Sequence, residues 1–249
     1  MKPADQQWTV QRSGDRPAAV RLFLLPYAGG SSSAFSSWPE LLDPGIEACP
    51  VVLPGRERRI AEPPVPRMSQ LVPPLIEGLV PHLRPPFAFF GHSMGALIAF
   101  ETTRRLLLHG LPAPEHLFLS AACPTRSRHR NDRHRLGDEE LVTELRELSG
   151  TPPEFFDAPE LVALLLPTIR ADFELAETYE VPEGTRLPVP ITVFAGERDP
   201  SFPPSEAKAW QRHTTGSFAH HVLPGDHFFL NDQVRPMAGT IGQTLLTRP

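Results

Sequence analysis

One serine in this sequence lies in a pattern that could support nucleophilic chemistry. Ser93 is the central residue of Gly91-His92-Ser93-Met94-Gly95, a Gly-x-Ser-x-Gly motif. A short apolar run precedes the motif and a helix-like run follows it, which is the pattern of a nucleophile elbow, where a sharp turn joins a strand to a helix. If Ser93 is a nucleophile rather than an ordinary helix N-cap, the chain must also supply a base, an acid and an oxyanion hole.

The base and the acid can be sought by their position in the chain. A serine hydroxyl needs a base to take its proton, and the base needs an acid to fix its tautomer. Of the ten histidines, only His227 lies in a loop after the final predicted strand, at the carboxyl edge where sites form in open α/β sheets. Asp199 lies in the loop that leaves the penultimate strand, whereas Asp226 is too close in sequence to His227 to reach its ring. The order Ser93, Asp199, His227 is that of an α/β-hydrolase. The alternative for His227 is an ordinary solvent-exposed loop histidine, and the alternative for Asp199 is an Asp-Pro turn that caps a helix.

A loop of small residues, Pro26-Tyr27-Ala28-Gly29-Gly30-Ser31-Ser32, follows the first well-defined strand. In an α/β-hydrolase the oxyanion hole takes one N–H from such a loop and one from the residue after the nucleophile. These are the backbone N–H groups of Ala28 and Met94. A simple tight turn is the alternative, and the phosphate-loop signatures Gly-Lys-Ser/Thr and Gly-x-Gly-x-x-Gly do not occur here.

Predicted strands and helices alternate along most of the chain. The predicted strands cover Val20–Leu25, 46–53, 87–90, 117–121, 189–195 and Phe218–Leu223. Such alternation predicts an α/β protein of the α/β-hydrolase type, with a mostly parallel sheet flanked by helices on both faces. We expect a single domain over residues 1–249.

The alternation stops between about residues 123 and 187. Two helical segments, 138–148 and 159–179, predict a helical lid inserted over the sheet between core strands. Proline should interrupt helices because it lacks the N–H and clashes with the preceding turn. We therefore expect a break near Pro167, and a kinked or broken helix over 69–83.

Composition narrows the class of protein. The chain has 249 residues, 40% of them hydrophobic and 21% charged, and a net charge of −5. That charge argues against a general nucleic-acid binder. No apolar run approaches the roughly 18 residues that span a bilayer. The N-terminus also lacks the apolar core of a secretory signal. We expect a cytoplasmic monomer that binds neither membrane nor nucleic acid. No cluster has metal-ligand spacing, so we expect no metal and no cofactor.

Five motifs together resemble the type II thioesterases, the discrete editing thioesterases of polyketide and nonribosomal-peptide assembly lines. They are Leu-Pro-Tyr-Ala-Gly-Gly-Ser at 25–31, Leu-Pro-Gly-Arg-Glu at 53–57, Gly-His-Ser-Met-Gly at 91–95, Leu-Pro-Thr-Ile-Arg-Ala-Asp-Phe at 166–173 and Gly-Asp-His-Phe-Phe at 225–229. The resemblance extends from about residue 20 to 241. Tyr27 is a departure, because histidine is more usual at this position, and the proline-rich 69–83 helix is another.

The resemblance implies an enzyme that hydrolyses acyl groups from the phosphopantetheine arm of acyl or peptidyl carrier proteins, removing aberrant or stalled units. It also suggests that the basic segment 126–135 helps to recognise an acidic carrier, unless this segment is only a solvated loop. Three other functions remain open. A carboxylesterase or lipase would use the same catalytic residues, a release or cyclising thioesterase would be fused to its synthase, and a scaffold would bind carriers without turnover.

Overall fold

A single parallel sheet forms the centre of the protein. The computed structural model describes residues 8–9, 18–84, 86–124, 132–148 and 150–247. The strands follow the order β2-β1-β3-β4-β5-β6, and every neighbouring pair is parallel. Their bounds are β1 Val20–Leu25, β2 Ile46–Pro50, β3 Phe87–His92, β4 Leu117–Ser120, β5 Ile191–Gly196 and β6 Phe218–Leu223. The predicted α/β-hydrolase architecture is therefore confirmed.

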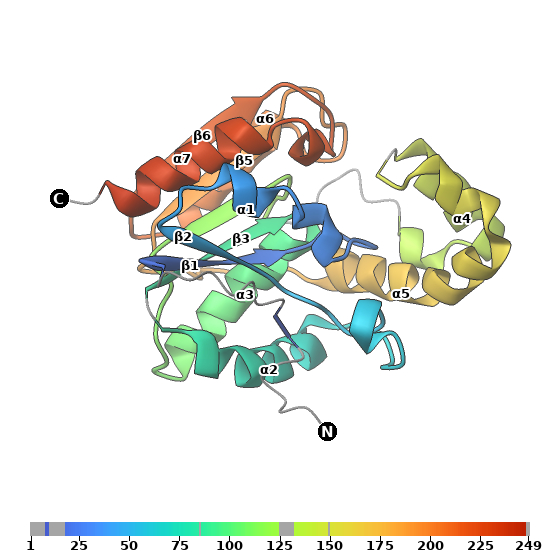
Figure 1. Cartoon of the computed structure of the whole chain (residues 1–249), viewed down its shortest axis with the longest axis horizontal. Coiled ribbons are helices and arrows are strands. Elements are labelled where there is room, and N and C mark those ends of the chain that lie inside the picture. The colour runs from blue at the N-terminus through green and yellow to red at the C-terminus, as the bar shows by residue number, and fades with distance from the viewer. Residues whose placement is uncertain (1–7, 10–17, 85, 125–131, 149, 248–249) are drawn as a thin grey trace.

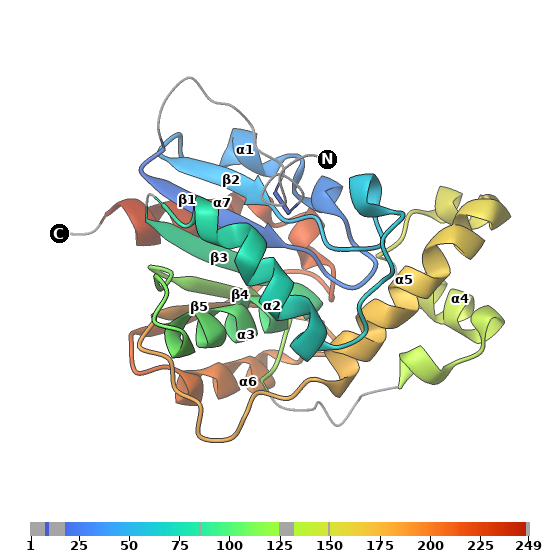
Figure 2. The ribbon, with the colours of Figure 1, turned by 90° about the horizontal axis from the view of Figure 1, so that it is seen from below.

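Helices cover both faces of this sheet (Figures 1 and 2). The α-helices are α1 Trp38–Leu41, α2 Met68–Leu79, α3 Met94–Leu108, α4 Asp138–Glu147, α5 Pro159–Thr178, α6 Pro204–Ala207 and α7 Val234–Leu246. Helices α2 and α3 pack on one face, and α1 and α7 pack on the other. Among the described residues, none of these helices combines the length and the apolar character needed to span a bilayer.

The central strands β3, β4 and β5 are buried at every residue because both of their faces are covered, whereas the edge strand β6 is partly exposed. Successive side chains of a strand point to opposite faces. In β1 and β3, Phe23 and Phe89 therefore join the core beneath α2 and α3, whereas Leu24 and Phe90 join the core beneath α1 and α7. This two-sided burial explains why the central strands are nearly continuous apolar runs rather than alternating ones.

Two helices extend beyond the layered core. Figure 1 shows α4 and α5 beside the sheet rather than against either face. They follow β4 and precede β5, in the stretch where the sequence predicts an insertion, and the 3-10 turn Pro153–Asp157 lies between them. Residues 125–131 and 149 lie outside the described part, so the limits 123–187 and the role of this insertion as a lid remain predictions.

The α-helical part of the 69–83 segment ends just before Pro81, as the predicted interruption requires, but Pro73, Pro74 and Pro167 lie inside continuous helices. Helix α5 is continuous through Pro167, so the predicted break there is wrong, and α2 is continuous through Pro73 and Pro74. A 3-10 turn, Val80–His82, follows α2 and contains Pro81. Each helical proline removes one bond to the carbonyl four positions earlier. Those carbonyls belong to residues at the protein surface, where water can hydrate them: Ser69, Gln70 and Ala163.

The first turn of α3 lies unusually close to the ends of β1 and β3. A Cβ on Gly91 would lie 2.1 Å from the carbonyl oxygen of Gly95, and a Cβ on Gly95 would lie 2.1 Å from the carbonyl oxygen of Leu25. Both contacts are with backbone, which cannot rotate away. Only glycine fits at these two positions. The close packing of α3 against the ends of the strands places Ser93, which lies between β3 and α3, at the carboxyl edge of the sheet.

Candidate active site

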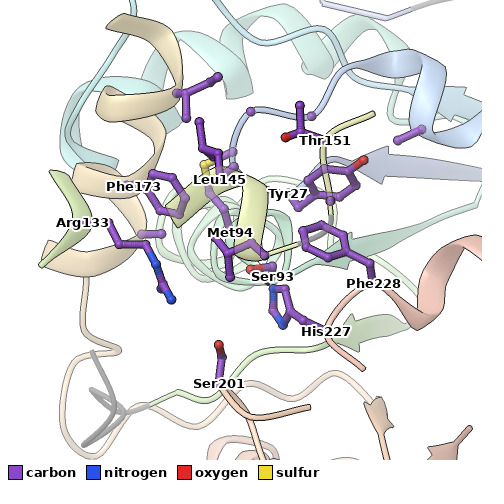
Figure 3. A pocket seen from close by; sticks show the side chains of 18 of the residues that line it. Tyr27, Ser93, Met94, Arg133, Leu145, Thr151, Phe173, Ser201, His227 and Phe228 are labelled. Carbon is purple, nitrogen blue, oxygen red and sulfur yellow. Dashed lines mark hydrogen bonds between the residues drawn. The ribbon is translucent and has the colours of Figure 1, made fainter. Parts of the chain in front are cut away.

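Ser93 occupies the sharp turn between β3 and α3. Its backbone has φ 53° and ψ −115°, a conformation that costs a non-glycine residue on the order of 1–3 kcal/mol. The turn is held by the Ser93 N–H, which donates to the Ser120 carbonyl at 2.8 Å. The Ser93 side chain makes no capping bond to α3, which argues against the ordinary N-cap and leaves its hydroxyl facing the pocket in Figure 3.

The side chains of Ser93, His227 and Asp199 form one hydrogen-bonded chain. His227 Nδ1 lies 2.8 Å from Asp199 Oδ2, and His227 Nε2 lies 3.1 Å from Ser93 Oγ. A carboxylate can only accept, so Nδ1 carries a proton. In the neutral imidazole Nε2 is then unprotonated and accepts the hydrogen bond of the Ser93 hydroxyl. The three residues chosen from the sequence therefore meet in the geometry in which an imidazole can take a proton from serine.

Asp199, rather than Asp226, contacts the histidine. The Asp199 side chain is buried, and its Oδ1 accepts the N–H groups of Ser201 at 2.9 Å and Phe202 at 3.1 Å. These bonds leave Oδ2 directed at His227. Asp226 is exposed, and its Oδ1 accepts the N–H of Phe228 at 2.9 Å. The structure thus gives the two carboxylates different tasks, and that of Asp226 is to stabilise its own turn.

The loop after β1 presents the backbone amide of Ala28 to the pocket that contains Ser93. Gly29 N–H donates to Asp172 Oδ2 at 2.8 Å, and Gly30 N–H donates to the Tyr27 carbonyl at 2.9 Å. Within the described part of the chain, the N–H groups of Ala28 and Met94 have no intramolecular acceptor. Both residues line the pocket at Ser93, and the Met94 N–H belongs to the first turn of α3, where the helix dipole favours negative charge.

The pocket at Ser93 is a cavity of about 440 Å³ that extends under α4 and α5. Its walls are largely apolar, and Figure 3 shows Leu145, Phe173 and Met94 around the space in front of Ser93. The helical spacing of residues 161–173 indicates this apolar face of α5. The sequence alone does not indicate that Leu145 of α4 lies opposite, because the connection between the helices sets their packing.

His92 is a buried histidine whose role the sequence did not reveal. A carbonyl only accepts, so His92 Nε2–H donates to the His227 carbonyl at 2.9 Å, and Nδ1 accepts the Ser120 hydroxyl at 2.9 Å. Burial, and secondly the nearby His227, lower the pKa of His92 from 6.5 to about 3. A neutral His92 therefore ties the loop that carries His227 to the end of β4.

A further group of possible ligands lies where the insertion begins. Among the described residues, the ligand atoms of Asp132, His134 and Glu177 lie within 4.8 Å of one another. The Glu177 carboxylate already accepts the backbone N–H groups of Arg133 and His134 and pairs with the His134 ring. These bonds anchor the chain before α4 to the end of α5. The expectation of no metal and no cofactor stays a prediction, and residues 126–131 of the basic segment lie outside the described part.

Comparison with known proteins identifies the family. A family model of the thioesterase domain matches residues 20–245. The chain belongs to the thioesterase family. It is 40% identical to the gramicidin S biosynthesis protein GrsT of Aneurinibacillus migulanus over 225 residues, which are 90% of this chain and 88% of that protein. It is 41% identical to the thioesterase PikA5 of Streptomyces venezuelae over 232 residues, which are 92% of this chain and 82% of that protein.

A solved structure shows the same fold. The type II thioesterase BorB from the borrelidin biosynthetic cluster superposes with a TM-score of 0.83 and 38% identity, over 96% of each chain. The likeness to type II thioesterases indicated by the sequence motifs is therefore confirmed. Because the match covers nearly the whole chain, it includes the insertion that carries α4 and α5 as well as the sheet.

The buried His92 predicts a pH dependence of stability. Its pKa is lowered in the folded protein, so between pH 6.5 and about 3 the unfolded chain binds a proton that the folded protein does not. The free energy of unfolding should therefore fall with decreasing pH across this range, by up to ~1.4 kcal/mol per pH unit from His92 alone. His92→Gln keeps a donor and an acceptor but does not titrate.

The measurement is urea unfolding of the wild type and His92→Gln from pH 4 to pH 8. The difference between the two free energies should be constant above about pH 6.5 and change steadily below it, because only the wild type loses the contribution of His92. Parallel curves over the whole range would show that His92 does not titrate as described.

Proposed function

We propose that this thioesterase hydrolyses acyl groups from the phosphopantetheine arm of acyl or peptidyl carrier proteins. The observation that carries the proposal is the Ser93–His227–Asp199 chain of hydrogen bonds at an apolar cavity, in a chain of the thioesterase family. Relatives named for gramicidin S biosynthesis and borrelidin biosynthesis support a place beside such an assembly line. The carrier partner, the monomeric state and the cytoplasmic location are part of this proposal.

The first half of the reaction transfers the acyl group to the enzyme. His227 Nε2 takes the proton of the Ser93 hydroxyl as Oγ attacks the thioester carbonyl carbon. The tetrahedral intermediate collapses with cleavage of the carbon–sulfur bond, and the proton on His227 passes to the departing sulfur. The products are free phosphopantetheine thiol and an ester on Ser93. Asp199 keeps the imidazole in the required tautomer and stabilises its positive charge.

The second half returns the enzyme to its starting state. A water molecule gives a proton to His227 Nε2 and attacks the ester carbonyl. The second tetrahedral intermediate expels Ser93 Oγ, which recovers its proton from His227, and the carboxylic acid leaves. Both intermediates carry negative charge on the former carbonyl oxygen. The N–H groups of Ala28 and Met94 are the donors for it, and loss of one such donor typically lowers kcat by about 10²–10³.

The cavity fits an acyl chain better than a polar group. Its walls beyond Ser93 are formed mainly by aliphatic and aromatic side chains of α3, α4 and α5, among them Leu97, Leu145, Leu165 and Phe173. Moving an acyl chain from water into such a site is favourable by about 25 cal/mol for each Å² of apolar surface that becomes buried. The phosphopantetheine arm, which is polar, would then approach from the open side of the pocket.

A carboxylesterase remains the second candidate, because it would use the same triad. Hydrolysis of acyl-pantetheine thioesters and of matched oxygen esters should be compared for the wild type and Ser93→Ala. We expect a higher kcat/KM for the thioester, highest when it is presented on a carrier protein, and loss of the acyl-enzyme in Ser93→Ala, measured by mass spectrometry of the intact protein. Preference for the oxygen ester would instead favour the esterase, and an active Ser93→Ala protein would refute the assignment of the nucleophile.

Asp199→Asn tests the choice of acid. The variant should fold normally and lose about 10³–10⁴ in kcat, because the amide favours the wrong imidazole tautomer. Asp226→Asn is the matched control. Within the described part of the chain, the side chain of this exposed residue accepts one hydrogen bond, from the Phe228 N–H, and an amide oxygen can also accept it. The kinetic constants of both variants decide the matter. If Asp226→Asn were the severe variant and Asp199→Asn the mild one, the assignment of the acid would be wrong.

A further inference from the structure

A buried ion pair holds the loop that carries the Ala28 amide. Asp172 of α5 and Arg56 are both buried, and Arg56 Nη2 lies 2.7 Å from Asp172 Oδ1. The second carboxylate oxygen, Oδ2, accepts the Gly29 N–H at 2.8 Å. The second guanidinium nitrogen, Nη1, donates to the Gly30 carbonyl at 2.7 Å. One pair of side chains therefore binds the amide of one glycine and the carbonyl of the next.

The backbone of the two glycines needs this support because glycine has no side chain to restrict its φ and ψ angles. Gly29 has φ +74°, and glycine carries the largest conformational entropy of any residue. The peptide that joins Ala28 to Gly29 can rotate unless its N–H is bound. The carboxylate of Asp172 binds that N–H with a charge-assisted bond, which is stronger than a bond between neutral groups. The Ala28 N–H belongs to the preceding peptide, whose Tyr27 carbonyl accepts the Gly30 N–H at 2.9 Å. Holding the two glycines therefore holds the turn that directs the Ala28 N–H.

Charge neutrality makes the pair compatible with an oxyanion nearby. A lone carboxylate at Gly29 would oppose negative charge forming on the substrate oxygen. Arg56 compensates Asp172 at 2.7 Å, so the pair as a whole adds little net charge to the site. Breaking a buried pair by removing one partner leaves an uncompensated buried charge, so the loop and the pair depend on each other.

Helix α5 is fixed to the core at the positions around Asp172. One turn earlier, the Thr168 hydroxyl donates to the Gly55 carbonyl at 3.0 Å, next to Arg56 in sequence. Beyond the C-terminal end of α5, the Tyr179 hydroxyl donates to Glu101 Oε2 of α3 at 2.9 Å. Both Thr168 and Glu101 are buried. Helix α5 therefore forms part of the frame of the active site, although it belongs to the insertion.

We propose that Asp172 and Arg56 are positioning residues of the oxyanion hole, which act by fixing the Ala28 N–H through the Gly29-Gly30 backbone. The proposal rests on the proposed function only in the role given to Ala28. It predicts a specific defect: stabilisation of the tetrahedral intermediate is lost while binding of the ground state is kept. If the pair only attached α5 to the core, its loss would not weaken stabilisation of the tetrahedral intermediate more than binding of the ground state.

The test compares Asp172→Asn with the wild type on an acyl-pantetheine thioester and on a 4-nitrophenyl acyl ester. Asp172→Asn should lower kcat by about 10²-fold on both substrates, the cost of a misplaced oxyanion donor, with KM little changed. The inhibition constant of a trifluoromethyl ketone, which forms a tetrahedral adduct with serine, should rise by a similar factor. The dissociation constant of a thioether analogue without the carbonyl oxygen should stay as in the wild type.

Glu174→Gln is the matched control. It breaks a different contact of the same helix, the partly exposed Arg67–Glu174 pair with 2.6 Å between Nη2 and Oε1, and should leave all four constants unchanged. If Asp172→Asn does not fold, Arg56→Lys takes its place, because lysine keeps the charge beside Asp172 but cannot reach both Asp172 and the Gly30 carbonyl. It should show the same separation.

Two results would overturn the proposal. Folded Asp172→Asn with wild-type kcat and inhibition constant would show that the pair does not position the loop. An equal loss for the ketone and the thioether would show a distorted pocket rather than a displaced donor. Failure of the wild type on the thioester, with turnover of the 4-nitrophenyl ester, would refute the proposed substrate and leave this test intact, because the ester and the ketone report on Ser93 directly.

Discussion

The active site depends on the close approach of backbone segments around the elbow. Gly91 and Gly95 allow the first turn of α3 to lie against the ends of β1 and β3, at distances that no side chain permits. The approach holds Ser93 at φ 53°, outside the regions that a serine prefers, and lines up its hydroxyl with His227. It also brings the Met94 amide beside the loop that follows β1. The same close packing therefore positions Ser93 and the Met94 amide, which we propose as an oxyanion donor.

Two buried side chains hold the remaining parts of the site against this fixed centre. His92, directly before Ser93 in the chain, donates to the carbonyl of His227. Asp172 of α5, together with Arg56, binds the glycine loop. Each uses a hydrogen bond to backbone, so each fixes a loop rather than a single side chain. A site built this way is preorganised, which is what electrostatic stabilisation of a transition state requires.

The sequence predicted the sheet, and it singled out Ser93, Asp199 and His227, which the structure brings within hydrogen-bond distance of one another. Both depend on local pattern and chain order, and the role of the Ala28 and Met94 amides stays a prediction. Apolar runs ended by turns mark strands, and the residues after a strand lie at its carboxyl edge wherever the strand packs. The roles of Asp172 and Arg56 were not predictable in this way, since 116 residues separate them and their contact exists only in the fold. The predicted interruption at the prolines inside α2 and α5 was wrong for a related reason. Whether water can hydrate the carbonyls that lose their partner depends on which face of the helix is exposed, and the fold decides this.

A crystal structure of the protein inactivated by an alkyl fluorophosphonate tests the central claim most directly, because the adduct mimics the tetrahedral intermediate. The account predicts phosphorus bonded to Ser93 Oγ, the alkyl chain in the cavity under α4 and α5, and the phosphonyl oxygen about 2.7–3.1 Å from the nitrogens of Ala28 and Met94. Gly29 N–H should still bind Asp172. An adduct on another residue, or a phosphonyl oxygen bound by Gly29 or Gly30 in place of Ala28, would contradict it.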